Sequence, residues 1–432
     1  MTRKKGNRPM VLSSQFFKEK VLHCVASSDS SPLLLPSQLI YWIRYTDPLS
    51  TATDGGMAES KKFNVGVIGY GVSAKIFHIP FITTTPAFNL HSILQRKPTP
   101  GSSAPNDYPQ LKHFTSLDDF LADSSLDVVV VTTPPETHFP FVRQALEAGR
   151  HVLVEKPFVP SSAEADTLLR LAREKGRVLC VYQNRRWDAD FLTVRKLVSE
   201  GTLGRVVELD THFDLYRPEK PSRASWKTSL GLEGGGTAIY DLGTHLIDQA
   251  YALFGPPRSV FAKFASQRDG ALSGPAVNND DLDIDSVTAH LYYDSGLVIN
   301  VRIGVLSAEA RQPRFWVRGS RGSYRKFGMD PQEGQLGAAD GPRPGDARYG
   351  REGPEWSGRL AVVGQDGNIS ESECPTVEPQ TYGRIYELFG EGLRSGKEED
   401  VPVPASQARD VLKIIEAAKE SAKSGREVEV RL

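Results

Sequence analysis

The fold of this chain is decided by one stretch of twelve residues, Phe63-Asn64-Val65-Gly66-Val67-Ile68-Gly69-Tyr70-Gly71-Val72-Ser73-Ala74. Its first half is an apolar run that predicts a buried strand, and its second half has the pattern G-x-G-x-x-A. In that pattern Gly69 permits a tight turn, Gly71 lets the backbone approach a pyrophosphate, and the small Ala74 lets the next helix pack closely on the strand. The phosphates would lie at the helix N-terminus, beside Val72 and Ser73. An ordinary glycine-rich turn is the alternative, but a strand before it and a helix after it favour a dinucleotide-binding loop.

From this stretch onward, short apolar runs alternate with helical patterns. That alternation predicts right-handed βαβ crossovers and a doubly wound parallel sheet of the Rossmann type over residues 60–182. The run Val128-Val129-Val130-Val131 suits a strand that is covered on both faces. The expected strands are 63–69, 89–94, 127–132, 151–154 and 178–182, and the expected helices are 73–84, 139–148 and 162–175.

The pattern changes after residue 183 and predicts a C-terminal α+β domain, residues 183–432, built on a large open mixed sheet. Tyr292-Tyr293-Asp294-Ser295-Gly296 marks a hairpin turn. Residues 328–379 hold ten glycines and six prolines, so an extended loop or wrapping arm is expected there. The other expected elements are helices at 191–199, 240–254 and 406–424, and strands at 260–264, 286–293, 297–305 and 315–317.

The composition limits the class of protein. The chain has 432 residues and a net charge of −1, so it lacks the excess of Lys and Arg that a general nucleic-acid binder needs. No apolar run approaches the ~20 residues that span a bilayer. Cys24, Cys180 and Cys374 are far apart, which argues against a disulfide framework or a cysteine zinc site and fits a reducing compartment. We therefore expect a cytoplasmic protein without nucleic acid or membrane as partner.

The N-terminal extension, residues 1–58, is left out of the predicted domains. Residues 1–56 carry seven Lys/Arg against four acids and are rich in Ser, without strand or helix periodicity. Three interpretations stay open: an organelle transit peptide, a disordered extension, or a translation start placed too early, since the stretch from Met57 to Lys62 looks like a natural beginning just before the first strand.

The end of the second predicted strand indicates which dinucleotide is preferred. Folds that prefer NAD usually place Asp or Glu there, about 20 residues beyond the glycines, to hold the ribose 2′-hydroxyl. This chain has Gln95, Arg96 and Lys97 instead. Two cations suit a 2′-phosphate, so the sequence predicts that NADP(H) is preferred over NAD(H). The alternative is a solvated Arg-Lys pair at the start of a loop.

Two further segments end predicted parallel strands, where ligands of such sheets bind. The first, Thr132-Thr133-Pro134-Pro135-Glu136-Thr137-His138, is expected to line the cofactor through Thr132, Thr133, Pro134 and His138; a proline-stiffened turn is the alternative. The second is Glu155-Lys156-Pro157. Beside an oxidised nicotinamide, Lys156 would suit proton transfer or polarisation of a hydroxyl. A surface lysine is the alternative.

The stretch Gly234-Gly235-Gly236 leads into a predicted helix on which Asp241, His245 and Asp248 share one face. An acid at the helix start and a histidine one turn later make a plausible acid/base pair. A capping Asp with a structural His is the alternative. No third ligand falls at a typical metal spacing, so no metal is expected.

Two clusters combine amides, cations and tryptophans, which suit hydrogen bonding to and stacking on a small polyhydroxylated substrate. They are Gln183-Asn184-Arg185-Arg186-Trp187-Asp188 and Arg223-Ala224-Ser225-Trp226-Lys227. Salt bridges and domain-edge packing are the alternative. The expected substrate-binding residues are Asn184, Arg185, Trp187, Trp226, Tyr240 and His245.

The order of these motifs resembles that of the glucose–fructose oxidoreductase, inositol dehydrogenase and rhizopine-catabolism (Gfo/Idh/MocA) family. The likeness runs from residue 62 to the C-terminus, and residues 322–333 are similar to a subgroup with NADP-dependent scyllo-inositol dehydrogenase-like proteins. It implies a Rossmann domain followed by a domain whose open sheet often makes a dimer, so we expect a homodimer or a higher homo-oligomer. It also implies hydride transfer to or from a secondary alcohol or ketone of a sugar, cyclitol or related molecule.

The resemblance assigns catalysis to Lys156, Asp241 and His245. His245 would take the hydroxyl proton, Asp241 would orient the site, and Lys156 would bind the reacting oxygen, although either Lys156 or His245 could be the base. Some relatives of this fold are cofactor-sensing regulators that bind a protein partner and catalyse nothing. The presence of all three residues favours an enzyme.

Overall fold

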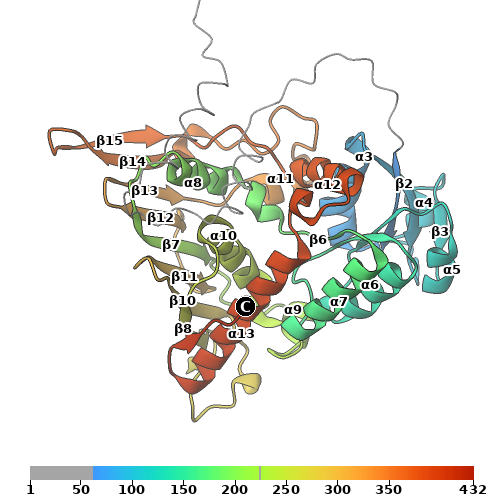
Figure 1. Cartoon of the computed structure of the whole chain (residues 1–432), viewed down its shortest axis with the longest axis horizontal. Coiled ribbons are helices and arrows are strands. Elements are labelled where there is room, and N and C mark those ends of the chain that lie inside the picture. The colour runs from blue at the N-terminus through green and yellow to red at the C-terminus, as the bar shows by residue number, and fades with distance from the viewer. Residues whose placement is uncertain (1–61, 223–224) are drawn as a thin grey trace, which may run out of the picture. The chain divides into compact units, whose positions relative to one another are not determined.

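The computed structural model describes residues 62–222 and 225–432 (Figure 1). The predictions for the N-terminal extension fall outside these residues. Two β-sheets organise the described part, a sheet of six strands and a sheet of ten. The predicted fold class, a Rossmann sheet followed by an α+β part on a large mixed sheet, is thereby confirmed.

The first sheet has the order β3-β2-β1-β4-β5-β6, and all its strand pairs are parallel. This is the strand order of dinucleotide-binding Rossmann sheets, which bind their ligands where the order reverses, at the carboxyl ends of β1 and β4. The strands are β1 (Phe63–Ile68), β2 (Phe88–Leu94), β3 (Lys112–Phe114), β4 (Val128–Val131), β5 (His151–Val154) and β6 (Leu179–Val181). The sequence did not predict β3, which has three partly exposed residues and therefore no apolar run.

Helices connect these strands. The predicted helix at 162–175 is confirmed: the Ser161 side chain caps its start by accepting a hydrogen bond from the backbone of Glu164, and Gly176 ends it with a left-handed conformation. The predicted helix at 73–84 is present, but its first part is a π-helical turn. The elements are η1 (Ala74–His78), α3 (Ile79–Thr84), α4 (Ala104–Asp107), α5 (Leu117–Ala122), η2 (Pro135–Thr137), α6 (His138–Glu147) and α7 (Ser162–Lys175).

The second sheet is mixed, since β7 and β11 are parallel and the other strand pairs are antiparallel. The predicted hairpin at 292–296 joins β10 to β11. Its order is β15-β14-β13-β12-β7-β11-β10-β8-β16, with β9 paired to β8. The strands are β7 (Val206–Asp214), β8 (Ser259–Ser266), β9 (Ala271–Leu272), β10 (Ser286–Tyr292), β11 (Val298–Gly304), β12 (Pro313–Gly319), β13 (Gly322–Phe327), β14 (Gly358–Val363), β15 (Ile369–Cys374) and β16 (Val428–Glu429).

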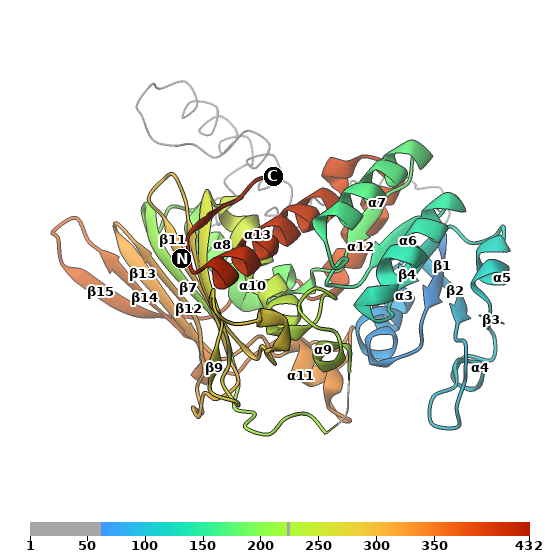
Figure 2. The same ribbon diagram turned by 90° about the horizontal axis from the view of Figure 1, so that it is seen from below.

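Three long helices, α8, α10 and α13, lie on one face of this second sheet (Figure 2). They bury the apolar side chains that alternate along β10 and β11. The helices of this half are η3 (Asn184–Trp187), α8 (Ala189–Ser199), α9 (Trp226–Ser229), η4 (Ile239–Gly243), α10 (Thr244–Phe254), η5 (Asn279–Asp281), α11 (Gln332–Gly337), η6 (Pro354–Trp356), α12 (Gly383–Ser395), η7 (Glu398–Asp400) and α13 (Ala405–Ser424).

The segment 328–379, predicted as an extended loop or wrapping arm, contains regular structure instead of a loop, namely α11 and the β14–β15 hairpin. Its glycines allow close packing: a Cβ on Gly358 would lie 2.4 Å from the Tyr324 ring. Few side chains of β14 and β15 are buried, so these strands lack the alternating apolar pattern that predicts a strand. The sequence also missed β7, β13 and α12.

The C-terminal segment returns to the first sheet. The Val181 N–H of β6 donates to the Val403 carbonyl at 3.1 Å, just before α13. Tyr386 of α12 is buried, stacks on Phe81 of α3, and has its hydroxyl 2.6 Å from His78 Nδ1. The second half of the chain therefore supplies part of the core of the Rossmann half.

This packing predicts different costs for two substitutions of Tyr386. Tyr386→Ala removes a buried ring and should lower the free energy of unfolding by about 3–5 kcal/mol. Tyr386→Phe keeps the ring and removes only the partner of His78, so the loss should be about 1–3 kcal/mol. Urea unfolding followed by circular dichroism measures both. Equal losses for the two variants would contradict this account of the packing.

Candidate active site

The glycine loop after β1 has the geometry that a pyrophosphate requires. Gly69 has a φ of 100°, and a Cβ there would lie 2.8 Å from Thr132 Oγ1, so only glycine fits. Among the described residues, no heavy atom lies within 4 Å of a Cβ placed on Gly71, so no described part of the chain fills the space beside this backbone. Val72 is 69% exposed, while Ala74 is fully buried where the helix packs on the sheet. The residues present therefore fit a dinucleotide.

Glu155 connects this loop to the end of β5. One of its oxygens accepts hydrogen bonds from the Ser73 hydroxyl and from His78 Nε2, and the other accepts from the Lys156 backbone N–H at 2.9 Å. Burial by itself would raise the pKa of Glu155, but the hydrogen bond and charge of His78, the Ser73 hydroxyl and the Lys156 charge lower it to about 2. The ionised carboxylate thus fixes the Lys156 backbone relative to the loop. The Lys156–Pro157 peptide bond is cis.

The turn after β4 lies beside the glycine loop. The Thr132 hydroxyl donates to the Ile68 carbonyl at 2.9 Å, and Thr133 is hydrogen-bonded to Thr137. Pro134 is exposed. His138, by contrast, is fully buried, with Nε2 against the Thr133 carbonyl and Nδ1 against the carbonyls of residues 157 and 158. Its enclosed ring does not fit the predicted contact with a cofactor and instead positions the turn.

Arg96 and Lys97, the two cations predicted to bind a 2′-phosphate, lie shortly after the end of β2. Gln95 is engaged in structure, since its amide donates to the Ser102 carbonyl and accepts from the Ala104 N–H, both at 2.8 Å. Arg96 and Lys97 are exposed, and neither forms an ion pair with another residue of the described ranges.

Lys156 and Asp241 meet between the two sheets. The Lys156 ammonium lies 3.0 Å from Asp241 Oδ1 and 2.8 Å from the Asp241 carbonyl oxygen. A second ammonium, that of Lys227 on α9, lies 2.7 Å from Asp241 Oδ2. Burial would raise the pKa of Asp241, but the charges and hydrogen bonds of the two lysines lower it to about 2. The sequence predicted Lys227 only as a member of a cluster that suits a polyhydroxylated substrate, and its contact with Asp241 was not predicted.

His245 lies one turn after Asp241, at the start of α10, and is 5% exposed. Its pKa is lowered well below the usual value, first by burial and then by the charges of Lys156, Arg185, Arg314 and Lys227. Within the described part of the chain, neither ring nitrogen has a hydrogen-bond partner. The structure therefore presents a neutral imidazole able to accept a proton. The third residue of the predicted face, Asp248, is instead paired with buried Arg186 at 2.7 Å.

Some of the predicted substrate-binding residues lie at the site, and others are buried in the core. Trp226 is half-buried, and its ring lies 5.8 Å from the Lys156 ammonium, within the site. Asn184 is 7% exposed. Trp187 and Tyr240 are buried, and the Tyr240 hydroxyl donates to a backbone carbonyl. Their large rings belong to the core, so the predicted contact of these two with substrate does not fit the structure.

Comparison with known proteins identifies the family. Residues 63–183 match the model of an oxidoreductase family with an NAD-binding Rossmann fold, and residues 191–325 match the Gfo/Idh/MocA C-terminal domain. The chain belongs to the Gfo/Idh/MocA oxidoreductase family.

Its relatives include an uncharacterised oxidoreductase of Schizosaccharomyces pombe, 39% identical over 84% of this chain and 98% of the relative. The NADP⁺-dependent scyllo-inositol 2-dehydrogenase IolW of Bacillus subtilis is 34% identical over 86% of this chain and 97% of the relative. Among solved structures, the oxidoreductase YvaA of Bacillus subtilis is similar, with a TM-score of 0.76 and 31% identity over 87% of this chain and 100% of that one.

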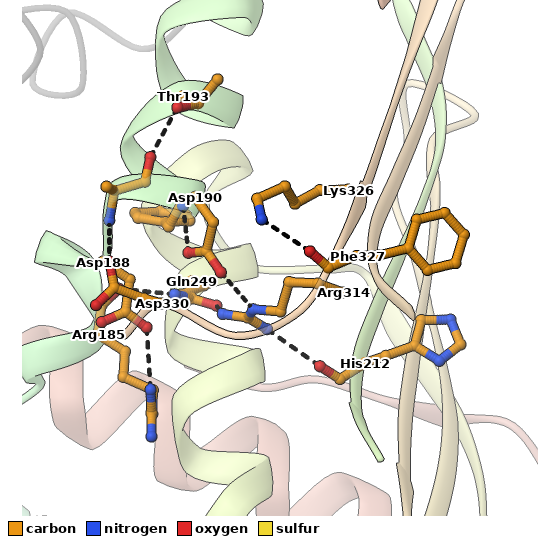
Figure 3. A network of polar contacts seen from close by, with 12 residues as sticks. Arg185, Asp188, Asp190, Thr193, His212, Gln249, Arg314, Lys326, Phe327 and Asp330 are labelled. Carbon is orange, nitrogen blue, oxygen red and sulfur yellow. Dashed lines mark hydrogen bonds and ion pairs between the residues drawn. The ribbon is translucent and has the colours of Figure 1, made fainter. Parts of the chain in front are cut away.

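In this member of the family, Arg185 belongs to a buried charge network (Figure 3). Arg185 pairs with Asp188 at 3.1 Å and with Glu333, and Arg314 pairs with Asp190 at 3.0 Å. Gln249 links the two arginines, since it donates to the Arg185 carbonyl and accepts from Arg314 Nη2. The two terminal nitrogens of Arg185 are thus paired with acids, which favours the salt-bridge alternative over a substrate contact, while its buried Nε has no hydrogen-bond partner among the described residues.

The described residues contain neither a helix able to span a membrane nor a cluster able to hold a metal ion. Across the described ranges, each helix is too short or too polar to span a bilayer. Within the same ranges, no group of three His, Cys, Asp or Glu side chains is arranged to hold a metal ion.

The two loop glycines predict a matched pair of variants. Gly69→Ala forces a side chain into a left-handed conformation against Thr132, so the free energy of unfolding should fall by about 1–3 kcal/mol. In Gly71→Ala the added methyl group meets no atom of the described residues, so stability should stay unchanged while dinucleotide affinity falls, because the methyl group fills space that the phosphates need. Thermal unfolding and cofactor titration by fluorescence separate the two effects. Unchanged affinity in the folded Gly71→Ala variant would contradict the assignment of the loop.

Proposed function

We propose that this family member is an NADP(H)-dependent oxidoreductase that interconverts a secondary alcohol and a ketone on a sugar, cyclitol or related polyhydroxylated molecule. The observation that carries the proposal is the Lys156 ammonium held against Asp241, with the neutral imidazole of His245 one turn further along. The similarity to IolW and, over 42% of this chain at 33% identity, to galactose 1-dehydrogenase of Pseudomonas fluorescens supports the substrate class.

Lys156 is suited to hold the reacting oxygen. An ammonium group has three N–H donors, and Asp241 accepts two of them through Oδ1 and its backbone carbonyl. The third has no hydrogen-bond partner within residues 62–222 and 225–432, so it is available for a substrate oxygen. A cation at this position stabilises the negative charge that develops when the hydroxyl loses its proton.

His245 is suited to accept that proton. Burial and neighbouring cations keep its imidazole neutral, and a neutral ring has an acceptor nitrogen. Lys156 already donates two of its N–H groups to Asp241, whereas His245 has an acceptor nitrogen, so we assign the role of base to His245. A dinucleotide held by the loop of Gly69 and Gly71 would supply the nicotinamide carbon that exchanges the hydride.

Variants of the two residues test the reaction. Lys156→Ala and His245→Ala should each lower kcat by about 10²–10⁴-fold, because the charge stabilisation or the proton acceptor is lost, while the Kd of NADPH stays within about threefold of wild type. The measurement is NADP⁺ reduction with a panel of sugars and cyclitols, with cofactor binding followed by fluorescence. Both variants turning over at the wild-type rate would refute the assignment. Cofactor binding without turnover of any substrate by the wild-type protein, together with a co-purifying protein, would indicate a cofactor-sensing regulator.

The preference for NADP(H) rests on Arg96 and Lys97, which are exposed and unpaired within the described residues at the end of β2. We expect the double variant Arg96→Ala/Lys97→Ala to raise the KM for NADP⁺ about 10–100-fold, as lost charge-assisted hydrogen bonds to a 2′-phosphate would do, and to leave the KM for NAD⁺ unchanged. Lys112→Ala, which removes an exposed cation of β3, is the control and should change neither value. A wild-type protein that favours NAD⁺ would refute this preference.

A further inference from the structure

The Asp241 carboxylate is shared by two ammonium groups that come from different parts of the chain. Lys156 follows β5 and lies 3.0 Å from Oδ1, while Lys227 belongs to α9 and lies 2.7 Å from Oδ2. The pairing therefore uses both carboxylate oxygens, one for each lysine. A carboxylate held on both sides cannot rotate about its last bond without breaking one of the two contacts.

Lys227 is held in place although its side chain is half-exposed. Trp226 lies beside it on α9, with the indole ring 5.6 Å from the Lys227 ammonium and 5.8 Å from that of Lys156. Both distances are within the range of cation–π attraction. The start of α9 is stabilised by a hydrogen bond of 3.2 Å that the Ser225 N–H donates to the Thr228 hydroxyl. One carboxylate and one indole thus fix both ammonium groups.

We propose that Lys227 is a positioning residue of the reaction, which holds Asp241 at Oδ2 so that Lys156, held at Oδ1, directs its remaining N–H toward the substrate oxygen. This inference rests on the proposed function, since it assigns a role within the same site. Lys227 acts through Asp241 and Lys156, and the chemistry stays with Lys156 and His245.

The charges around His245 give Lys227 a second effect. The cations that face this ring are Lys156, Lys227, Arg185 of η3 and Arg314 of β12. Each arginine has its own buried carboxylate, whereas the two lysines share that of Asp241. The next acid along α10 is occupied elsewhere, since Asp248 pairs with Arg186. The surplus positive charge beside His245 therefore comes from the lysine pair, and removing Lys227 removes it.

The sign of the pH effect follows from this arrangement. Burial and the surrounding cations lower the pKa of His245, so the ring stays neutral as pH falls. Without the Lys227 charge, the ring would gain its proton at a higher pH. Oxidation of the alcohol needs the neutral ring, so its acidic limb should move to higher pH in the variant.

The test compares Lys227→Met and Lys227→Arg with a matched control, Lys220→Met. Lys220 is also half-exposed, and it pairs with the carboxylates of Asp269 and Asp283 rather than with that of Asp241. Lys227→Met should lower kcat about tenfold, as loss of positioning does, with the KM for NADP⁺ unchanged, and Lys227→Arg should recover most of the loss. Lys220→Met should match the wild-type protein. Lys227 is half-exposed and Asp241 keeps its contact with Lys156 in the Lys227 variants, so all three variants should fold.

A second measurement does not need turnover. The cofactor-free protein, with histidine labelled at Cε1, is titrated by NMR, and the His245 signal is assigned by its absence in His245→Asn. In Lys227→Met the midpoint should rise by about half a unit to one unit relative to wild type, and in Lys220→Met it should not move.

The outcomes separate the inference from the proposed function. If kcat and the His245 titration are the same in Lys227→Met as in Lys220→Met, the inference is overturned, and turnover by the wild-type protein still stands. A loss of kcat that Lys227→Arg does not recover, or that comes with an equal change in the KM for NADP⁺, also overturns it. If the wild-type protein turns over no substrate, the proposed function fails, and the NMR shift alone still decides whether Lys227 acts on His245.

Discussion

The contact between Lys156 and Asp241 is the interaction on which the site depends, because it joins the end of a parallel strand to the start of a helix packed on the other sheet. A largely buried ion pair is stable only where further hydrogen bonds satisfy the remaining donors and acceptors. Here the Lys156 backbone is held by Glu155, and the second oxygen of Asp241 is held by Lys227. The charged groups of the site, Glu155, Lys156, Asp241 and Lys227, are therefore positioned by contacts with one another.

The buried network beside the site follows the same rule with an excess of acid. Asp188, Asp190 and Asp330 lie together, with Arg185 and Arg314 as the paired cations. Burial, followed by the charges of Asp188 and Asp190, raises the pKa of Asp330 well above its usual value. Each of the two arginines is paired with a nearby carboxylate, although both charges still contribute to the lowered pKa of His245. The network thus connects η3, the start of α8 and β12 through buried ion pairs.

Local sequence patterns were sufficient to predict the elements whose structure is determined by neighbouring residues. Turn geometry and burial depend on residues that are adjacent in the sequence. The sequence therefore predicted the glycine loop, the strand of four valines and the capped helix that ends at Gly176. The hairpin of β14 and β15 was missed because its strands are paired by backbone hydrogen bonds and bury few side chains. Likewise, a cluster of arginines, acids and tryptophan has the same composition whether it binds a sugar or fills a core, and only the fold shows that Trp187 is buried.

Lys227 illustrates the remaining limit, since a lysine in a polar segment carries no sign of its partner. Its position becomes meaningful only when α9 is seen to bring its ammonium group to a carboxylate that already serves Lys156. An extra cation in a fully buried site would be costly, because desolvation penalises each uncompensated charge. Lys227 is half-exposed, so water lowers that cost on one side while the charge still acts on the buried imidazole on the other. A site that must keep a histidine neutral and a lysine charged can therefore place its surplus charge at the solvent boundary.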